Sequence, residues 1–448
     1  MKNHSLRIGI VSLLAALLLS CGGGGGGGGG SGAVFGNGGV GAPLAGAGSP
    51  APAAQAAPSG NGLGGIAADD GSGSATTTAA SGGDDGSGVG SGGTGVSTAD
   101  ATGIGAVDGA GSIIVNGLRY QTGAAVGHIE DAAGLQLGMS AKVTGPVNAD
   151  FTSGIARSVD SAADLRGPLL SVDLTQGSFV VLGTTVTTDE ATVWADSSGL
   201  AALVPGKTLQ VWGLPAAPGM LRATRVEQRD PAAFIVTGTV QSLDAGAQTF
   251  RLGGLVVDYG SAVLSGSLDG RPLADGTLVR VRAEGASPGR LAATLVQWWY
   301  PVPTAEGSTL QIAGVITNYA GTGSLRVLGL EVDASSARIT GGPPGSLGTG
   351  VKVAVGGMLS NGILKATQLK IRNVPGTGGP ASFDLTGTVG AFRSAADFSV
   401  RGQAVNAGDP GVVFSNGTAA SLGNGAKVHV HGTRVVNGVL TAVSVEFE

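Results

Sequence analysis

The chain has 448 residues, among them 85 glycines and a single cysteine, and its formal net charge is −5. One cysteine excludes an internal disulfide and a cysteine-rich metal site, so the folded part must be stabilised by packing. Aromatic residues make up 4% of the chain. This scarcity weighs against the stacking surfaces with which proteins bind single-stranded nucleic acid.

Residues 1–21 have the parts of an export signal, which are a charged start, an apolar middle and a small-residue cleavage site. The apolar stretch is shorter than the roughly 20 residues that a membrane-spanning helix needs. Its end, Leu18 to Cys21, resembles the lipobox of bacterial lipoproteins. The resemblance implies that Cys21 carries lipid and anchors the chain in a membrane. Because Gly22 rather than aspartate follows, we expect the outer membrane, with the periplasmic or surface side left open.

Residues 22–100 have the composition of a disordered tether, with 30 glycines among 79 residues. Such a segment has too little apolar surface to offset the entropy of ordering its backbone. Gly88, Gly90 and Gly93 fit a dinucleotide-binding pattern, but no predicted strand precedes them and no helix follows. We therefore predict no cofactor.

The rest of the chain consists of five tandem copies of one sequence module. Each copy has a glycine near its middle and a second glycine 21 to 23 residues later, as at Gly183 and Gly206. The copies are predicted to span residues 101–164, 165–231, 232–305, 306–379 and 380–448.

Each copy predicts five short strands with a helical turn between the third and the fourth. The fourth strand alternates strictly, as at 427–431, which indicates one buried and one water-facing side. Asn361-Gly362 and Asn437-Gly438 before the fifth strand are typical of type I′ hairpins, whose two central residues need positive φ. The strand order predicts an all-β fold of five tandem OB-like barrels, with an SH3-like barrel as the rival.

The recurring elements are Gly-x-Val, Phe-x-Val-x-Gly, Leu-x-x-Gly, Val-x-Val and a closing Ala-Thr-x-Val. In this pattern the chain resembles the bacterial family called domain of unknown function 5666, which occurs in tandem in envelope lipoproteins. The resemblance covers residues 101–448 and is weaker in the first copy. It implies a fold and an envelope location, but no activity, substrate or catalytic residue.

Positive charge recurs on the predicted water-facing side of the fourth strands, and an aromatic cluster lies where the third copy passes into the fourth. These positions are candidates for binding a polymer such as an anionic polysaccharide. They are Lys142, Arg280, Arg282, Lys352, Lys427, His429, His431, Trp298 and Trp299. The two tryptophans are open to a second interpretation, which is packing between the third and fourth copies.

The few histidines bear on catalysis and metal binding. His128 has no aligned histidine in another copy, and no residue is predicted to be catalytic. His429 and His431 lie on one side of a strand, yet a third ligand is missing from the pattern, so no metal site is predicted.

These observations favour a non-enzymatic, lipid-anchored binding protein for an envelope or extracellular polymer or protein. The alternative is a structural spacer or assembly subunit whose repeats set a distance. An enzyme with one specialised copy is the third hypothesis. Nucleic acid is disfavoured as a partner, and the oligomeric state is left open.

Overall fold

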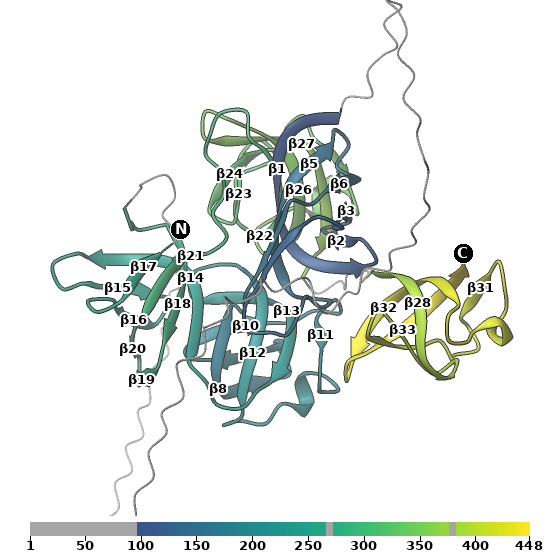
Figure 1. Cartoon of the computed structure of the whole chain (residues 1–448). Helices are drawn as coiled ribbons and strands as arrows, with labels where there is room; N and C mark the ends of the chain where they lie inside the picture. Colours follow the sequence, from purple (N-terminus) through teal and green to yellow (C-terminus); the bar gives the residue numbers. More distant parts are fainter. Residues whose placement is uncertain (1–95, 266–271, 376–381) are drawn as a thin grey trace, which may run out of the picture. The chain divides into compact units, whose positions relative to one another are not determined.

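The computed structural model describes residues 96–265, 272–375 and 382–448. The export signal, the lipobox with Cys21 and nearly all of the predicted tether lie outside these residues. Within them the fold is built from strands and three short 3₁₀ turns, so the all-β prediction is confirmed (Figure 1). No helix in the described part of the chain has the length and apolar character needed to cross a bilayer.

The first two copies contain the strands β1 to β13. Copy 1 comprises β1 (Val96–Ala110), β2 (Ile113–Val115), β3 (Leu118–Gln121), β4 (Val126–Ile129), β5 (Ser140–Asn148), β6 (Ser153–Ile155) and β7 (Ser158–Ser161). Copy 2 comprises β8 (Leu165–Asp173), β9 (Ser178–Val181), β10 (Thr184–Thr187), β11 (Val193–Trp194), the 3₁₀ turn η1 (Leu200–Ala202), β12 (Thr208–Pro215) and β13 (Met220–Gln228).

The other three copies follow the same order. Copy 3 comprises β14 (Phe234–Asp244), β15 (Thr249–Leu252), β16 (Leu255–Asp258), β17 (Val263–Ser265), β18 (Leu278–Ala283), β19 (Gly285–Ser287), β20 (Arg290–Ala292) and β21 (Leu295–Trp298). Copy 4 comprises β22 (Thr309–Tyr319), β23 (Leu325–Val327), β24 (Leu330–Asp333), β25 (Arg338–Thr340), η2 (Pro344–Ser346), β26 (Lys352–Ser360) and β27 (Ile363–Asn373). Copy 5 comprises β28 (Phe383–Ser394), β29 (Asp397–Val400), β30 (Gln403–Asn406), β31 (Val413–Ser415), η3 (Ala419–Ser421), β32 (Lys427–Val436) and β33 (Val439–Phe447).

The same pairings recur in every copy. In copy 5, β28 pairs antiparallel with both β29 and β32, β29 pairs with β30, β30 runs parallel to β33, and β32 pairs with β33. The β32–β33 hairpin closes as the sequence predicts, because Asn437 and Gly438 have φ of 49° and 73°. It is drawn in yellow in Figure 1. Asn361 and Gly362 close the equivalent hairpin in copy 4 with φ of 52° and 75°.

Strands of different copies are also hydrogen-bonded to one another. Strand β1 of copy 1 pairs in parallel with β22 of copy 4 and with β28 of copy 5. Strand β8 of copy 2 pairs antiparallel with β14 of copy 3. The result is a 19-stranded sheet and a 14-stranded sheet. The prediction of five separate small OB-like barrels is therefore wrong, as is the SH3-like alternative, because the copies stack through large shared sheets in a β-solenoid-like way.

The hydrophobic cores cross copy boundaries in the same way. One cluster joins copies 2 and 3, including Phe179 and Phe250. The cluster of copy 4 also takes in Ile104 from copy 1, and that of copy 1 takes in Trp212 from copy 2. Apolar surface that an isolated copy would expose is buried against a neighbouring copy instead.

This packing corrects the interpretation of the fourth strands. Alternation predicted one water-facing side, but nearly every residue of β12 is buried, and so are the first six residues of β26. The strand β32 of copy 5 does alternate between buried and more exposed residues. The second side of β12 and β26 is covered by other copies, and a sequence pattern within one copy carries no signal for that.

Candidate functional site

The nine candidate polymer-binding residues do not form one exposed stripe. Lys427 is exposed, whereas Arg280 and Lys352 are only 4% and 9% exposed. Three of the nine line one hollow between copies 1 and 3, namely Lys142, Arg280 and Trp298. The other six lie in different surroundings.

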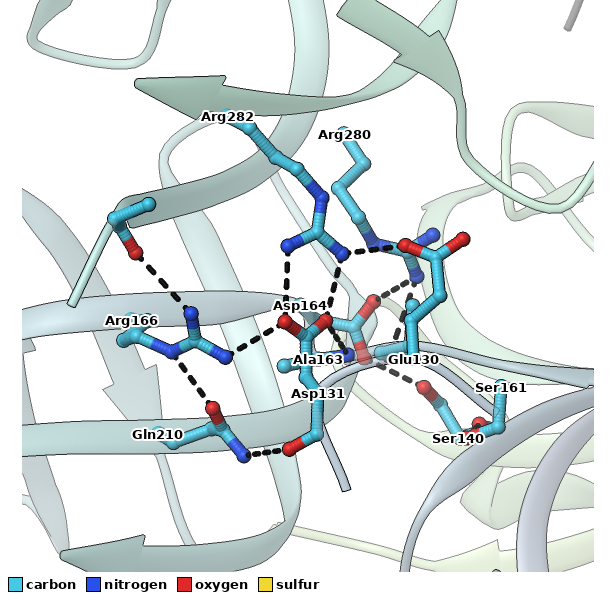
Figure 2. A network of polar contacts seen from close by, with 12 residues as sticks. Glu130, Asp131, Ser140, Ser161, Ala163, Asp164, Arg166, Gln210, Arg280 and Arg282 are labelled. Carbon is cyan, nitrogen blue, oxygen red and sulfur yellow. Dashed lines mark hydrogen bonds and ion pairs between the residues drawn. The ribbon is translucent and has the colours of Figure 1, made fainter. Parts of the chain in front are cut away.

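Arg280 on β18 belongs to a buried network in which three copies meet (Figure 2). Its guanidinium donates to Asp164 Oδ1 at 2.9 Å, and the Asp164 side chain is fully buried. Asp164 also accepts from Ser140 Oγ at 2.6 Å and from Trp299 Nε1 at 2.6 Å. Burial opposes the charge of Arg280, but Asp164 and Tyr300 outweigh it and raise the pKa of Arg280.

Asp131 forms the second centre of this network, after strand β4. It accepts from Arg166 of copy 2 at 2.7 Å and from Arg282 of copy 3 at 2.7 and 2.9 Å. Burial works to raise the pKa of the Asp131 carboxyl, but Arg282 and Arg166 overcome this effect and hold it below its usual range. Figure 2 shows these arginines converging on Asp131 and Asp164. Three arginines thus meet three carboxylates, the third being Glu130 beside Arg282.

The aromatic cluster lies at the junction between copies 3 and 4. Trp299 and Tyr300 are 2% and 5% exposed and pack in the core cluster of copy 4. The Tyr300 hydroxyl donates to Ser140 O of copy 1 at 2.9 Å. Their rings therefore serve packing between copies, which is one of the two interpretations that the sequence left open.

Trp298 lines two hollows. A polar hollow of about 200 Å³ is lined by Trp298 together with Lys142, Arg280, Gln297 and the His128–Asp160 pair. His128 Nδ1 lies 3.0 Å from Asp160 Oδ1. Gln297 Oε1 and Arg280 Nε are buried without a hydrogen-bond partner in the described structure. Two unpaired polar atoms beside an aromatic ring are a feature of ligand sites, because buried polar groups are otherwise almost always satisfied.

A second hollow, of about 360 Å³, adjoins the first and shares Trp298, Tyr300 and Pro301 with it. Its lining is mainly apolar and includes Leu278 of copy 3 and Leu328 of copy 4. Trp298, Tyr300 and Pro301 thus line both the polar and the apolar hollow.

His429 and His431 of β32 both lie 3.2 Å from Asp384 Oδ1. The hydrogen bond to Asp384 raises the pKa of His429, and the same bond lowers the pKa of Asp384. Across the described residues, no group of three or more acidic, histidine or cysteine side chains is arranged to hold a metal ion. His128 hydrogen-bonds to Asp160, and within the described chain no serine hydroxyl is hydrogen-bonded to its ring.

Sequence reasoning did not single out Asp131, Asp164 or Gln297. Asp164 and Arg280 are 116 residues apart, and Asp131 and Arg282 are 151 apart. No periodicity connects such positions. The aligned column of Arg280 holds Lys142, Gln210, Ala354 and His429 in the other copies, so it gave no signal of a buried arginine.

Comparison with protein families agrees with the internal repeats. Residues 166–227, 237–297 and 386–446 match the family described as Domain of unknown function (DUF5666). The chain carries tandem repeats of DUF5666. The matched DUF5666 segments fall on copies 2, 3 and 5, and the polar hollow is lined partly by the second of them. No curated protein matches the chain.

Proposed function

We propose that this protein is a non-enzymatic binding protein of the bacterial envelope, anchored through lipid on Cys21, whose DUF5666 copies hold a segment of a carbohydrate polymer beside Trp298. The observation that carries the proposal is the pair of adjoining hollows that share Trp298, Tyr300 and Pro301. A sugar ring has apolar faces and hydroxyl edges, so it suits an apolar wall next to unpaired polar atoms.

The charges around the polar hollow favour a neutral or weakly anionic polymer. Arg280 is neutralised by Asp164, and His128 is paired with Asp160. Lys142 is the lining cation without an ion-pair partner among the residues described. A single available ammonium supports one anionic contact and does not support a continuous electrostatic stripe.

The binding test uses the whole chain on an array of bacterial polysaccharides. We expect the variants Lys142→Met and Gln297→Met to lose at least tenfold in affinity for the polymer that the wild type retains. Lys427→Met removes an exposed lysine of copy 5 and serves as the matched control. Wild-type binding that survives both substitutions would place the polymer elsewhere, and no binding to any glycan would contradict the proposal.

The anchor is tested separately. Cys21→Ser removes the thiol that lipidation requires, and we expect the protein to move from the membrane fraction to the soluble fraction. Mass spectrometry of the wild-type N-terminal peptide should show acylated Cys21 as the first residue. An unmodified Cys21 in a membrane-bound protein would exclude this mode of anchoring.

A structural spacer is the second candidate, and a specific observation favours it. Side chains that could serve a ligand, such as Arg282, are used for contacts between copies. A spacer requires rigid junctions, which buried ion-pair networks provide. This candidate would be supported if the whole chain bound nothing on any array and if no glycan changed its unfolding temperature.

A further inference from the structure

A cavity of about 140 Å³ lies where four of the five copies meet, away from the hollows beside Trp298. Its lining includes Asp108 of copy 1, Thr224 of copy 2, Lys352 and Arg372 of copy 4, and Phe383 of copy 5. A water molecule occupies about 30 Å³ in the liquid, so the cavity has room for more than one water.

Lys352 is the first residue of β26 and is 9% exposed. It has no hydrogen-bond or ion-pair partner among the described residues. Burial lowers the pKa of Lys352. An ammonium that is removed from water without a partner is costly, and proteins usually provide a counter-charge.

The carboxylates near Lys352 are already paired. Asp108 accepts from Arg372 at 2.5 Å, and Asp189 lies 3.4 Å from Arg222. Because both carboxylates are paired with arginines, Lys352 has no counter-charge of its own. Lys370, on the neighbouring strand β27, also lines the cavity with its side chain exposed, and it adds a second cation without a carboxylate partner.

Thr224 supplies a neutral donor at the same place. Its hydroxyl oxygen is buried and has no hydrogen-bond partner in the described chain. A buried hydroxyl that lines a cavity and lacks a partner indicates a ligand or water. The cavity thus combines two unpaired ammonium groups, an arginine and a free hydroxyl.

We propose that this cavity binds a small tetrahedral oxyanion, phosphate or sulfate, between Lys352, Lys370, Arg372 and Thr224. The anion supplies the counter-charge that Lys352 lacks and accepts from the Thr224 hydroxyl. Because the lining comes from four copies, the bound anion stabilises their association. A ligand that binds the native state alone raises the unfolding temperature as its concentration increases.

The test measures the thermal unfolding midpoint of the whole chain in an amine buffer that contains neither phosphate nor sulfate. Phosphate is added and compared with sodium chloride at equal ionic strength. We expect phosphate to raise the wild-type midpoint by several degrees and to saturate, and sulfate to act similarly. We expect Lys352→Met to abolish the response. Lys427→Met changes the aligned but exposed lysine of copy 5 and should keep the response.

Two further arms make the result decisive. If Lys352→Met does not fold, Lys370→Met at the exposed rim is tested instead. We expect the wild type to broaden the ³¹P NMR line of phosphate. Absence of this broadening with Lys370→Met supports the proposal. Glucose 6-phosphate distinguishes free anion from the phosphate end of a larger molecule, because a cavity of about 140 Å³ should be too small for the ester. An equal midpoint in phosphate and chloride, or an equal response in Lys352→Met and wild type, overturns the proposal. Neither outcome bears on polymer binding beside Trp298.

Discussion

Buried arginines and a buried lysine differ in their partners at two junctions between the copies. Where copies 1, 2 and 3 meet, Arg166, Arg280 and Arg282 are matched by carboxylates. Where copies 1, 2, 4 and 5 meet, Lys352 is buried without one. At the first junction each arginine has a carboxylate partner, whereas the second junction leaves Lys352 without one beside a cavity. Buried cations in one fold can therefore serve stability in one place and ligand binding in another.

The largest expected effect comes from breaking the first junction. Asp164→Ala leaves Arg280 buried and uncompensated, and we expect the free energy of unfolding to fall by about 3–5 kcal/mol. Urea unfolding followed by circular dichroism measures the change. Asp397→Ala removes an exposed ion pair with Arg393 and should cost less than about 0.5 kcal/mol. A loss at Asp164 as small as that at Asp397 would show that the network does not hold the junction.

The next prediction concerns the backbone contact between copies 5 and 2. Gly438 N donates to Trp194 O, and a Cβ at Gly438 would lie 2.8 Å from Ala195 O. Gly362 has nearly the same positive φ in copy 4, but nothing lies within 4 Å of a Cβ there.

Alanine at either glycine should cost about 1 kcal/mol through backbone strain. We expect Gly438→Ala to cost about 1 kcal/mol more, because Ala195 is in the way. Urea midpoints of the two variants measure the difference. Equal midpoints would mean that this contact between copies contributes nothing.

A smaller effect is expected when the charge at the second junction is changed. Asp108→Asn removes the carboxylate that partly neutralises Arg372. If an oxyanion binds beside Lys352, its affinity should increase about fivefold, which corresponds to roughly 1 kcal/mol. Calorimetric titration with phosphate measures the affinity. Weaker binding by Asp108→Asn would instead indicate that the carboxylate positions Arg372 for the anion.

The smallest effect is expected from the pair of histidines on β32. The pKa of His429 is raised by Asp384 above its ordinary 6.5, so its protonated form stabilises the fold at low pH. This contribution is lost as the pH rises through the folded pKa. The pKa of Asp384 is lowered from 3.8, so its contribution is lost below about that pH. The pair therefore stabilises most between about pH 4 and pH 6.5.

Since these side chains are about one-third exposed, the gain should be below about 1 kcal/mol. It is measured as the difference in stability between the wild type and Asp384→Asn at pH 6 and pH 8. The difference should shrink at pH 8, and an NMR titration should show a lower pKa for His429 in the variant. A constant difference between the two pH values would contradict this assignment.

Local features of the fold could be predicted from the sequence because they depend on neighbouring residues. Asn437-Gly438 specifies its hairpin through the positive φ that both residues adopt readily. The third strands, at positions such as Val257 and Val405, and the 3₁₀ turn before the fourth strand in copy 5 follow from pattern alone.

Contacts between copies could not be predicted in this way. Gln210 and Trp212 occupy the side of β12 that alternation assigned to water, yet they are 1% and 0% exposed. The polar atoms of Gln210 are satisfied by Arg166, Glu227 and the backbone of Asp131. A glutamine on a surface and a glutamine in such a network look alike in sequence, because the difference lies in partners far along the chain. Each candidate site is likewise formed by residues that lie far apart in the sequence.

The pairing of β1 with β22 and β28 has a consequence for biogenesis. The earliest described strand to emerge during synthesis finds two of its hydrogen-bonding partners only after copies 4 and 5 have been made. If the chain is exported unfolded, copy 1 must wait on the far side of the membrane with an unsatisfied edge until the last copy has crossed. Such an edge favours wrong pairings, so a chaperone would have its greatest effect on the first copy.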